Sequence, residues 1–358
     1  MKTTNPKIRL LFYGVCLATV LYNCKTKDVA AVTPFTYTFK GLDDVTIPDI
    51  TQTTPASVSV TAATVTSSTL ASAVNNDLAG IAASGVVPAS VQQAGTDISK
   101  AVSASQAAQL SAAFTPSVLS TLASGGALPA DLKAQVDAIA SNPALKAYLP
   151  TFTLPTVNGK AVGGRLGATT PGASNGSSTA ATAYATTADD DACKAAANAA
   201  YNAALATLDA KKATQTATVT TTYSTAAAAI AAETAPCKAG IPAKYDPMKT
   251  AAQQTLNNTL ASLEAAKTTL GSLYDLLKAF AYVSYAQTIA GITTLEAAET
   301  TACDSVASAK LAAAAAARDT DLAKINTNYA AAVATLTTAR DKAVASCHNQ
   351  GGGRVGAE

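Results

Sequence analysis

Apolar residues recur at helical spacing along most of this chain, first in a set of short stretches between residues 69 and 154. Thr115-Pro116 reads as a helix N-cap followed by proline in the first turn. The pattern predicts a small lobe of four to six short helices. Its expected core comprises Leu110, Phe114, Leu119, Leu122, Leu132, Val136 and Ile139.

Residues 189–348 show the same period over much longer stretches. A first helix is expected to run to about Ala235, where the sequence PCKAGIP stops it, and Pro247 permits a second helix to begin. The second helix carries leucines seven residues apart, as in a coiled coil: Leu256, Leu263, Leu270 and Leu277. A third helix is expected from about Asp304, with apolar residues eleven apart: Leu311, Leu322, Val333 and Val344, and also Ile325 and Leu336.

The remaining segments have other patterns. Residues 24–68 are rich in Thr, Val and Pro, and PFTYTF alternates with a period of two, which predicts a tether with one or two short strands. Residues 155–188 are rich in Gly, Ser, Thr and Ala and are expected to form a flexible linker. Residues 349–358 are expected to be a disordered, glycine-rich tail. The fold class predicted is mainly α: a small N-terminal lobe of short helices with minor strand, then a long alanine-rich antiparallel three-helix bundle or coiled coil.

Composition agrees with slender helices and a thin core. Hydrophobic residues make up 49% of the chain, but many are alanine, which favours helix and buries little surface. Without residues 1–23 the chain has 22 basic and 23 acidic residues. A nearly neutral chain lacks the positive charge that binds nucleic acid, so we expect no nucleic-acid partner.

Four cysteines of the long helical region are predicted to form two disulfides: Cys193, Cys237, Cys303 and Cys347. The first two and the last two are each 44 residues apart, and similar motifs, AAETAPC and AAETTAC, end at Cys237 and Cys303. We therefore expect both of these cysteines at a helix end. Zinc is disfavoured because the chain has one histidine and no close cysteine pair.

Three pairings are open. An unbroken helix of 44 residues spans about 66 Å, so its two end cysteines cannot join. Three such helices running up, down and up would pair Cys193 with Cys303 and Cys237 with Cys347, and this stapled rod is the arrangement we favour. Hairpins within each segment would instead pair Cys193 with Cys237 and Cys303 with Cys347. A reversal at Gly271 would pair Cys193 with Cys347 and Cys237 with Cys303.

The N-terminus has the three parts of a signal sequence. Lys2, Lys7 and Arg9 precede an apolar run of about 13 residues, too short to span a bilayer, and the chain turns polar abruptly at Cys24. This stretch, LYNCKTKD, resembles the signal of bacterial lipoproteins, with Leu21 at the family's apolar position; Asn23 departs from the usual small residue. The resemblance implies a signal peptide over residues 1–23, lipidation of Cys24 and attachment to a membrane. The alternatives are ordinary secretory cleavage after Ala31 and a cytosolic protein with an apolar N-terminus.

No motif for catalysis stands out. The one histidine, His348, begins the tail, and the chain contains no G-x-S-x-G, H-E-x-x-H or C-x-x-C. We therefore expect no enzyme activity, no cofactor and no metal. The sequence favours a lipid-anchored protein of the cell envelope, outer membrane or cell surface with a structural or protein-binding role and an unknown protein partner. The alternative is a ligand-binding lipoprotein, for instance one that captures glycans.

Overall fold

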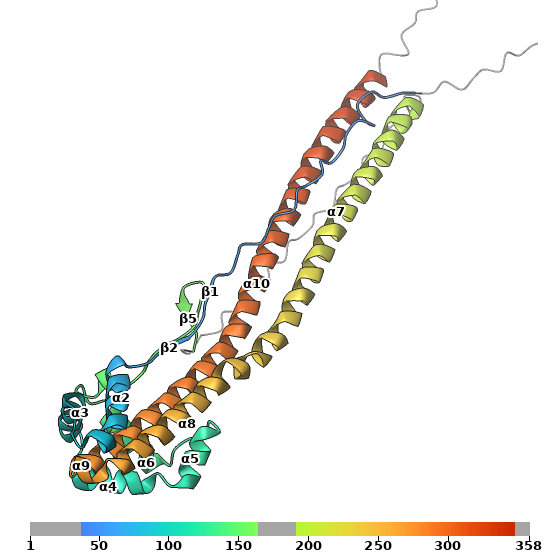
Figure 1. The fold of residues 1–358 in the computed structure, drawn as a ribbon. Coiled ribbons are helices and arrows are strands. Elements are labelled where there is room, and N and C mark those ends of the chain that lie inside the picture. The colour runs from blue at the N-terminus through green and yellow to red at the C-terminus, as the bar shows by residue number, and fades with distance from the viewer. Residues whose placement is uncertain (1–36, 164–190, 348–358) are drawn as a thin grey trace, which may run out of the picture. The chain divides into compact units, whose positions relative to one another are not determined.

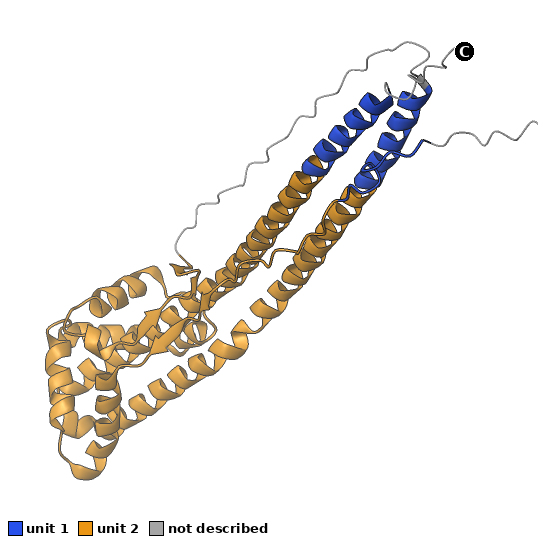
Figure 2. Cartoon of the chain, turned by 90° about the horizontal axis from the view of Figure 1, so that it is seen from above, with its two compact units in different colours: residues 1–46, 182–209, 331–358 blue, residues 47–181, 210–330 orange. Residues whose placement is uncertain are grey.

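The computed structural model describes residues 37–163 and 191–347 (Figure 1). The predictions for the signal peptide, Cys24, most of the linker, His348 and the tail lie outside these residues. The chain divides into two compact units (Figure 2). One comprises residues 1–46, 182–209 and 331–358, and the other comprises residues 47–181 and 210–330.

The lobe of short helices is confirmed. It consists of α2 (Thr69–Ser84), α3 (Ala89–Ser99), α4 (Ala104–Ala113), α5 (Pro116–Ala123), α6 (Ala130–Ala140) and the 3-10 helix η1 (Lys146–Tyr148). Local chemistry begins these helices: Thr115 caps α5 ahead of Pro116, and Ser103 forms a capping box with Gln106 at the start of α4. Of the expected core residues, Leu119 is half-buried and the others are buried.

Among the described residues, five short strands join the two ends of the lobe. β2 (Thr64–Thr66) pairs with β3 (Thr151–Thr153), and β4 (Thr156–Val157) pairs with β1 (Val60–Thr61) and with β5 (Lys160–Ala161), all antiparallel. The linker prediction is therefore wrong for residues 155–163. Asn158 and Gly159 both have positive φ and form the tight turn of a β-hairpin, a signal that the composition of the segment conceals. Val157 and Val162 are buried beside Ala302, which fixes the hairpin on the long helices.

The long helical region forms a bundle, as predicted, from α7 (Asp191–Ala239), α8 (Ile241–Ala265), the short α9 (Lys267–Leu270) and α10 (Leu273–Cys347). Its topology differs from the favoured one. α10 continues through residues 303 and 304, so the predicted helix start near Asp304 is wrong, because AAETTAC contains neither glycine nor proline to end a helix. Pro247 lies inside α8 rather than at its start, and Pro236 lies inside α7.

The chain reverses at Gly271. This residue has φ 55° and ψ −124°, a backbone conformation that side-chain-bearing residues strongly disfavour. The reversal places the start of α10 against α8, where the lobe also packs. The leucines of the predicted seven-residue series, Leu256, Leu263, Leu270 and Leu277, all lie in this core. Phe114 of the lobe stacks on Tyr282 of α10, with ring centroids 4.9 Å apart.

Candidate functional site

Two disulfides join α7 to α10. Cys193 bonds Cys347, with Cα atoms 5.8 Å apart, and Cys237 bonds Cys303, with Cα atoms 6.0 Å apart. The favoured pairing of Cys193 with Cys303 and Cys237 with Cys347 is therefore wrong. The pairing is the one that follows from a reversal at Gly271, because α10 is unbroken at Cys303 and runs antiparallel to α7. The bridges are nested: along the chain, the Cys193–Cys347 bridge encloses the Cys237–Cys303 bridge.

Both cysteines of α10 belong to a single eleven-residue series. Every member of this series is buried: Cys303, Ala314, Ile325, Leu336 and Cys347. In α7 a matching series of buried residues comprises Ala197, Leu208 and Val219. Eleven residues make three helical turns, so side chains at this interval keep the same face of a straight helix. The equal 44-residue spacing of the cysteines is thus four of these intervals. The other predicted series, which includes Leu322 and Val333, is half-buried.

Cation–π pairs follow the same interval. Tyr201, Lys212 and Tyr223 lie eleven apart on α7, and their partners Arg340, Tyr329 and Arg318 lie eleven apart on α10. The cation lies 5.0, 4.3 and 4.4 Å from the ring centroid in the three pairs. The pairing of α7 with α10 therefore keeps the same eleven-residue interval in each unit. The long side chains of these pairs lie beside the buried series of the two helices. Sequence reasoning missed these pairs, although the eleven-residue spacing of the aromatic and basic residues is visible in the sequence.

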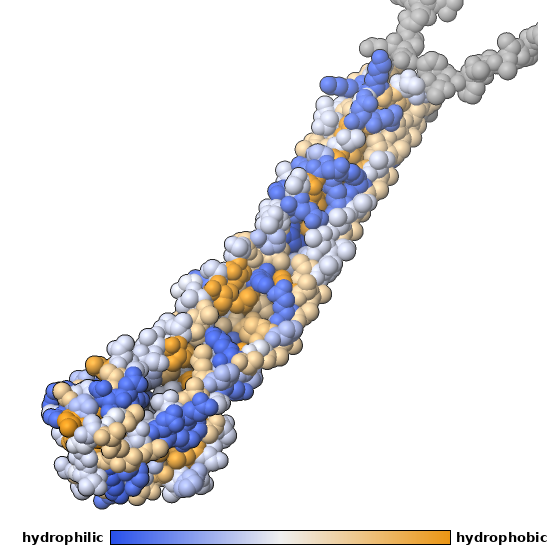
Figure 3. Space-filling model, viewed as in Figure 1, coloured by the Kyte–Doolittle hydropathy of each residue, from blue (hydrophilic) through white to orange (hydrophobic). Residues whose placement is uncertain are grey.

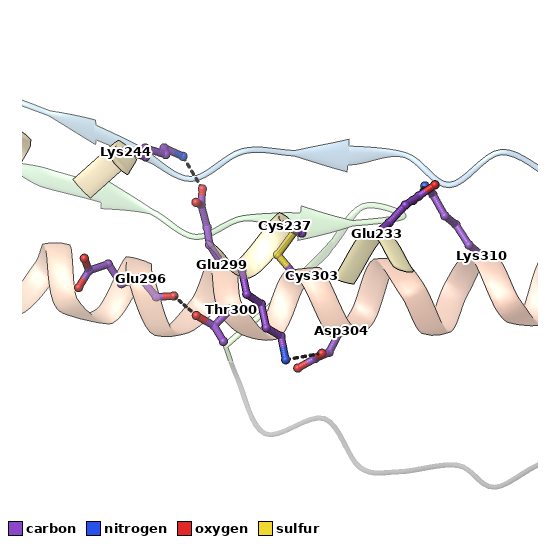
Figure 4. Close-up of a disulfide and its surroundings, with 10 residues drawn as sticks. Glu233, Cys237, Lys244, Glu296, Glu299, Thr300, Cys303, Asp304 and Lys310 are labelled. Carbon is purple, nitrogen blue, oxygen red and sulfur yellow. Dashed lines mark hydrogen bonds and ion pairs between the residues drawn. A yellow bond between two sulfur atoms is a disulfide. The ribbon is translucent and has the colours of Figure 1, made fainter. Parts of the chain in front are cut away.

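Charged residues surround the Cys237–Cys303 bridge (Figure 4). Lys244 of α8 forms an ion pair with Glu299 of α10, and the same carboxylate accepts a hydrogen bond of 3.2 Å from the Ala63 amide. Glu296 binds Lys249 at 2.7 Å, and Glu233 binds Lys310 at 2.5 Å. The side chains around the bridge therefore neutralise one another.

A buried tyrosine lies next to this cluster. The Tyr245 ring is fully buried, and its hydroxyl has no hydrogen-bond partner among the described atoms. Burial, followed by the negative charge of Glu299, raises the pKa of Tyr245 far above its usual range, so the phenol stays neutral. This residue is thus part of the buried core next to the bridge.

Residues 47–59, which we call the strap, run in an extended conformation along α7 and α10 (Figure 1). At its centre the Thr53 amide and hydroxyl both donate to the Asp321 carboxylate, at 2.8 and 2.5 Å. Asp321 is only 3% exposed. On α7, the Gln215 amide donates to the Pro48 carbonyl oxygen at 3.0 Å. Burial raises the pKa of Asp321, but the hydrogen bonds from Thr53 and Lys324 outweigh it, and the net pKa is below its ordinary value.

The lobe contains a cavity of about 420 Å³ between α2, α8 and α10. Its floor is apolar and includes Leu78, Leu256 and Leu277, and Tyr148 and Phe280 form an edge-to-face aromatic pair in its wall. Small residues widen it, among them Ala71, Ala252 and Ala281. Its lining contains no charged side chain.

The described residues offer no other chemistry that stands out. Residues 37–163 and 191–347 contain no group of three or more His, Cys, Asp or Glu side chains arranged to hold a metal. Within these ranges no helix is long and apolar enough to cross a membrane. On the face seen in Figure 3, strongly hydrophilic side chains form separate clusters along the helices, between stretches of weakly polar or weakly apolar surface.

The fold and these contacts define a disulfide-stapled helical bundle with a small lobe that contains a cavity. No family model, curated protein or solved structure matches this chain.

Proposed function

We propose that this protein is a non-catalytic, lipid-anchored component of the bacterial cell envelope or cell surface, with a structural or protein-binding role. The observation that carries the proposal is the pair of disulfides, Cys193–Cys347 and Cys237–Cys303, placed in one eleven-residue register. Disulfides persist in oxidising compartments, so they support export. The sequence around Cys24 supports anchoring, because two or three acyl chains hold a protein stably at a bilayer.

The position of the N-terminal segment fits this proposal. Residues 38–41, a short distance after Cys24 in the sequence, line a shallow groove with residues 335–346 of α10. Leu42 is fully buried, which holds this segment in place. An anchor on Cys24 would precede this contact by 14 residues in the sequence.

Metabolic labelling tests the anchor. The full chain, expressed in a bacterium fed an alkyne-tagged fatty acid, should acquire the tag and fractionate with membranes. Cys24→Ser should abolish both results. Cys16→Ser, which removes the other N-terminal cysteine, is the matched control and should leave both intact. Equal labelling of the Cys24→Ser variant would refute the anchor, and free thiols at the four helix cysteines in freshly isolated protein would refute export.

A structural role is tested by complementation. A strain that lacks the protein should become more permeable to detergent, and the wild-type gene should restore resistance. A variant without both disulfides, Cys193→Ser with Cys237→Ser, Cys303→Ser and Cys347→Ser, should restore it less well at equal abundance. Full resistance in the strain that lacks the protein would exclude a structural contribution to the envelope barrier and leave the protein-binding role.

A further inference from the structure

We propose that the cavity in the lobe binds a small uncharged alkyl amphiphile that has a hydroxyl head group. The inference goes beyond the proposed envelope role and does not depend on acylation of Cys24. It rests on three properties of the cavity: its size, its lack of charge and the direction of its hydrogen bonds. At about 420 Å³ the cavity lies within the range of sites that hold small molecules.

The walls favour an alkyl body. The cavity floor is formed by branched aliphatic side chains, including Leu78, Leu256 and Ile292, and they are buried. Ala252 of α8 and Ala281 of α10 also line the cavity, and their side chains are small. An alkyl chain that enters here removes apolar surface from water on both the ligand and the protein, which stabilises the complex.

The rim favours a head group that donates hydrogen bonds. Three hydroxyl groups of the lining already donate within the protein: Ser72 donates to the Ser68 carbonyl oxygen at 2.9 Å, Thr255 to that of Ala251 at 2.9 Å, and Thr288 to that of Ser284 at 2.7 Å. Deeper in, the Thr259 hydroxyl donates to the Asn75 side-chain oxygen at 3.3 Å. The hydroxyl oxygens therefore retain lone pairs as acceptors.

The two lining tyrosines also give up their protons internally. Tyr148 donates to Asp97 at 3.1 Å and Tyr285 donates to Gln253 at 2.5 Å. A carboxylate head only accepts hydrogen bonds and would meet neither a cation nor a free hydroxyl proton at these positions. An alcohol donates one proton and suits a rim of acceptors. Because the lining has no charged side chain to pair with a carboxylate, the cavity favours an alkyl alcohol over the corresponding fatty acid anion.

Titration of the purified full chain with 1-decanol, followed by protein-observed NMR, tests the proposal, with decanoate at pH 7 as the charged comparison. We expect saturable binding of one decanol per chain and at least tenfold weaker binding of decanoate. Ala281→Phe fills the cavity and should weaken decanol binding at least tenfold. Ala290→Phe adds the same ring at an exposed position of α10 outside the cavity and should leave binding unchanged.

A second variant covers the case in which Ala281→Phe disturbs the core. Ser72 is exposed at the cavity mouth, so Ser72→Phe obstructs entry without filling the interior, and it should also weaken binding at least tenfold. Absence of decanol binding, binding that both Phe variants retain, or decanoate binding as tight as that of decanol would overturn the proposal.

Discussion

Gly291 of α10 offers a sharp test of how the strands are held on the bundle. A Cβ atom at this position would lie 2.1 Å from Cζ of Phe152 and 2.4 Å from Cε1 and Cε2 of the same ring. Phe152 belongs to β3, which pairs with β2. The glycine therefore allows an aromatic ring to rest directly on the helix backbone.

Two opposing effects set the result of Gly291→Ala. Alanine in place of glycine stabilises a helix interior by about 1 kcal/mol. Against this, the clash with the ring forces Phe152 to move, and overpacking of this kind costs about 1–3 kcal/mol. Since three atoms at the far edge of the ring lie within 2.4 Å of the new methyl group, we expect the clash to prevail and the free energy of unfolding to fall by about 1–2 kcal/mol.

Without the Phe152 ring, Gly291→Ala should raise the free energy of unfolding instead of lowering it. In a Phe152→Ala background the new methyl group meets no ring, so Gly291→Ala should stabilise the protein by about 1 kcal/mol. The two backgrounds then differ by about 2–3 kcal/mol, the coupling expected of residues in direct contact. Gly80, in the exposed interior of α2 with nothing within 4 Å of its virtual Cβ, is the matched control. Gly80→Ala should stabilise by about 0.5–1 kcal/mol.

Urea unfolding followed by circular dichroism measures these free energies, with the disulfides intact throughout. Native-state hydrogen exchange at the β2 and β3 amides adds a local measurement, because displacement of Phe152 should raise exchange there first. If Gly291→Ala stabilises the wild-type chain as much as Gly80→Ala does, the described contact between Phe152 and α10 does not exist.

Three further predictions concern the bridge, the strap and the turn. Cys237→Ser with Cys303→Ser opens a loop with a sequence separation of 66 and should lower the free energy of unfolding in urea by roughly 4 kcal/mol; an unchanged value would contradict the bridge. The pKa of Asp321 is lowered on folding, so its stabilisation is complete above the unfolded pKa of about 3.9 and disappears as pH falls through the folded pKa. Asp321→Asn should therefore flatten the acid limb of a stability–pH curve, and an equally steep limb would argue against this role. Gly271→Ala should lower the free energy of unfolding, measured by thermal unfolding, by roughly 1–3 kcal/mol. Gly85→Ala should lower it less, because Gly85 adopts the milder left-handed conformation, and equal losses would count against the turn.

Most of the fold, namely the helical lobe and the long helical bundle, could be predicted from the helical spacing of apolar residues. The lobe could be foreseen because caps such as Ser103 and Thr115 act within a few residues of the chain. The strands were harder, since β2 pairs with β3 about 87 residues later and a two- or three-residue strand leaves almost no pattern. The sequence Asn158-Gly159 indicates a hairpin turn, but the glycine-rich residues after this pair made the whole segment resemble a linker.

The disulfide pairing was missed for a different reason. Two similar motifs before Cys237 and Cys303 suggested two helix ends, yet one ends α7 and the other lies inside α10. The decisive information was the conformation of one residue, Gly271, which composition does not reveal. The cavity could not be predicted at all, because it arises from alanines and serines of three helices that meet only after folding.

The nested bridges change how this chain responds to proteases. A single cut anywhere between Cys237 and Cys303 leaves one covalent molecule, because both fragments stay joined through sulfur at two places. The lobe residues before α7 have no such protection, since every bridged cysteine follows them in the sequence. Outside a cell, where clipping is frequent, the bundle would survive a nick in its turn as a single piece, whereas one cut ahead of Cys193 would leave the lobe attached by packing alone.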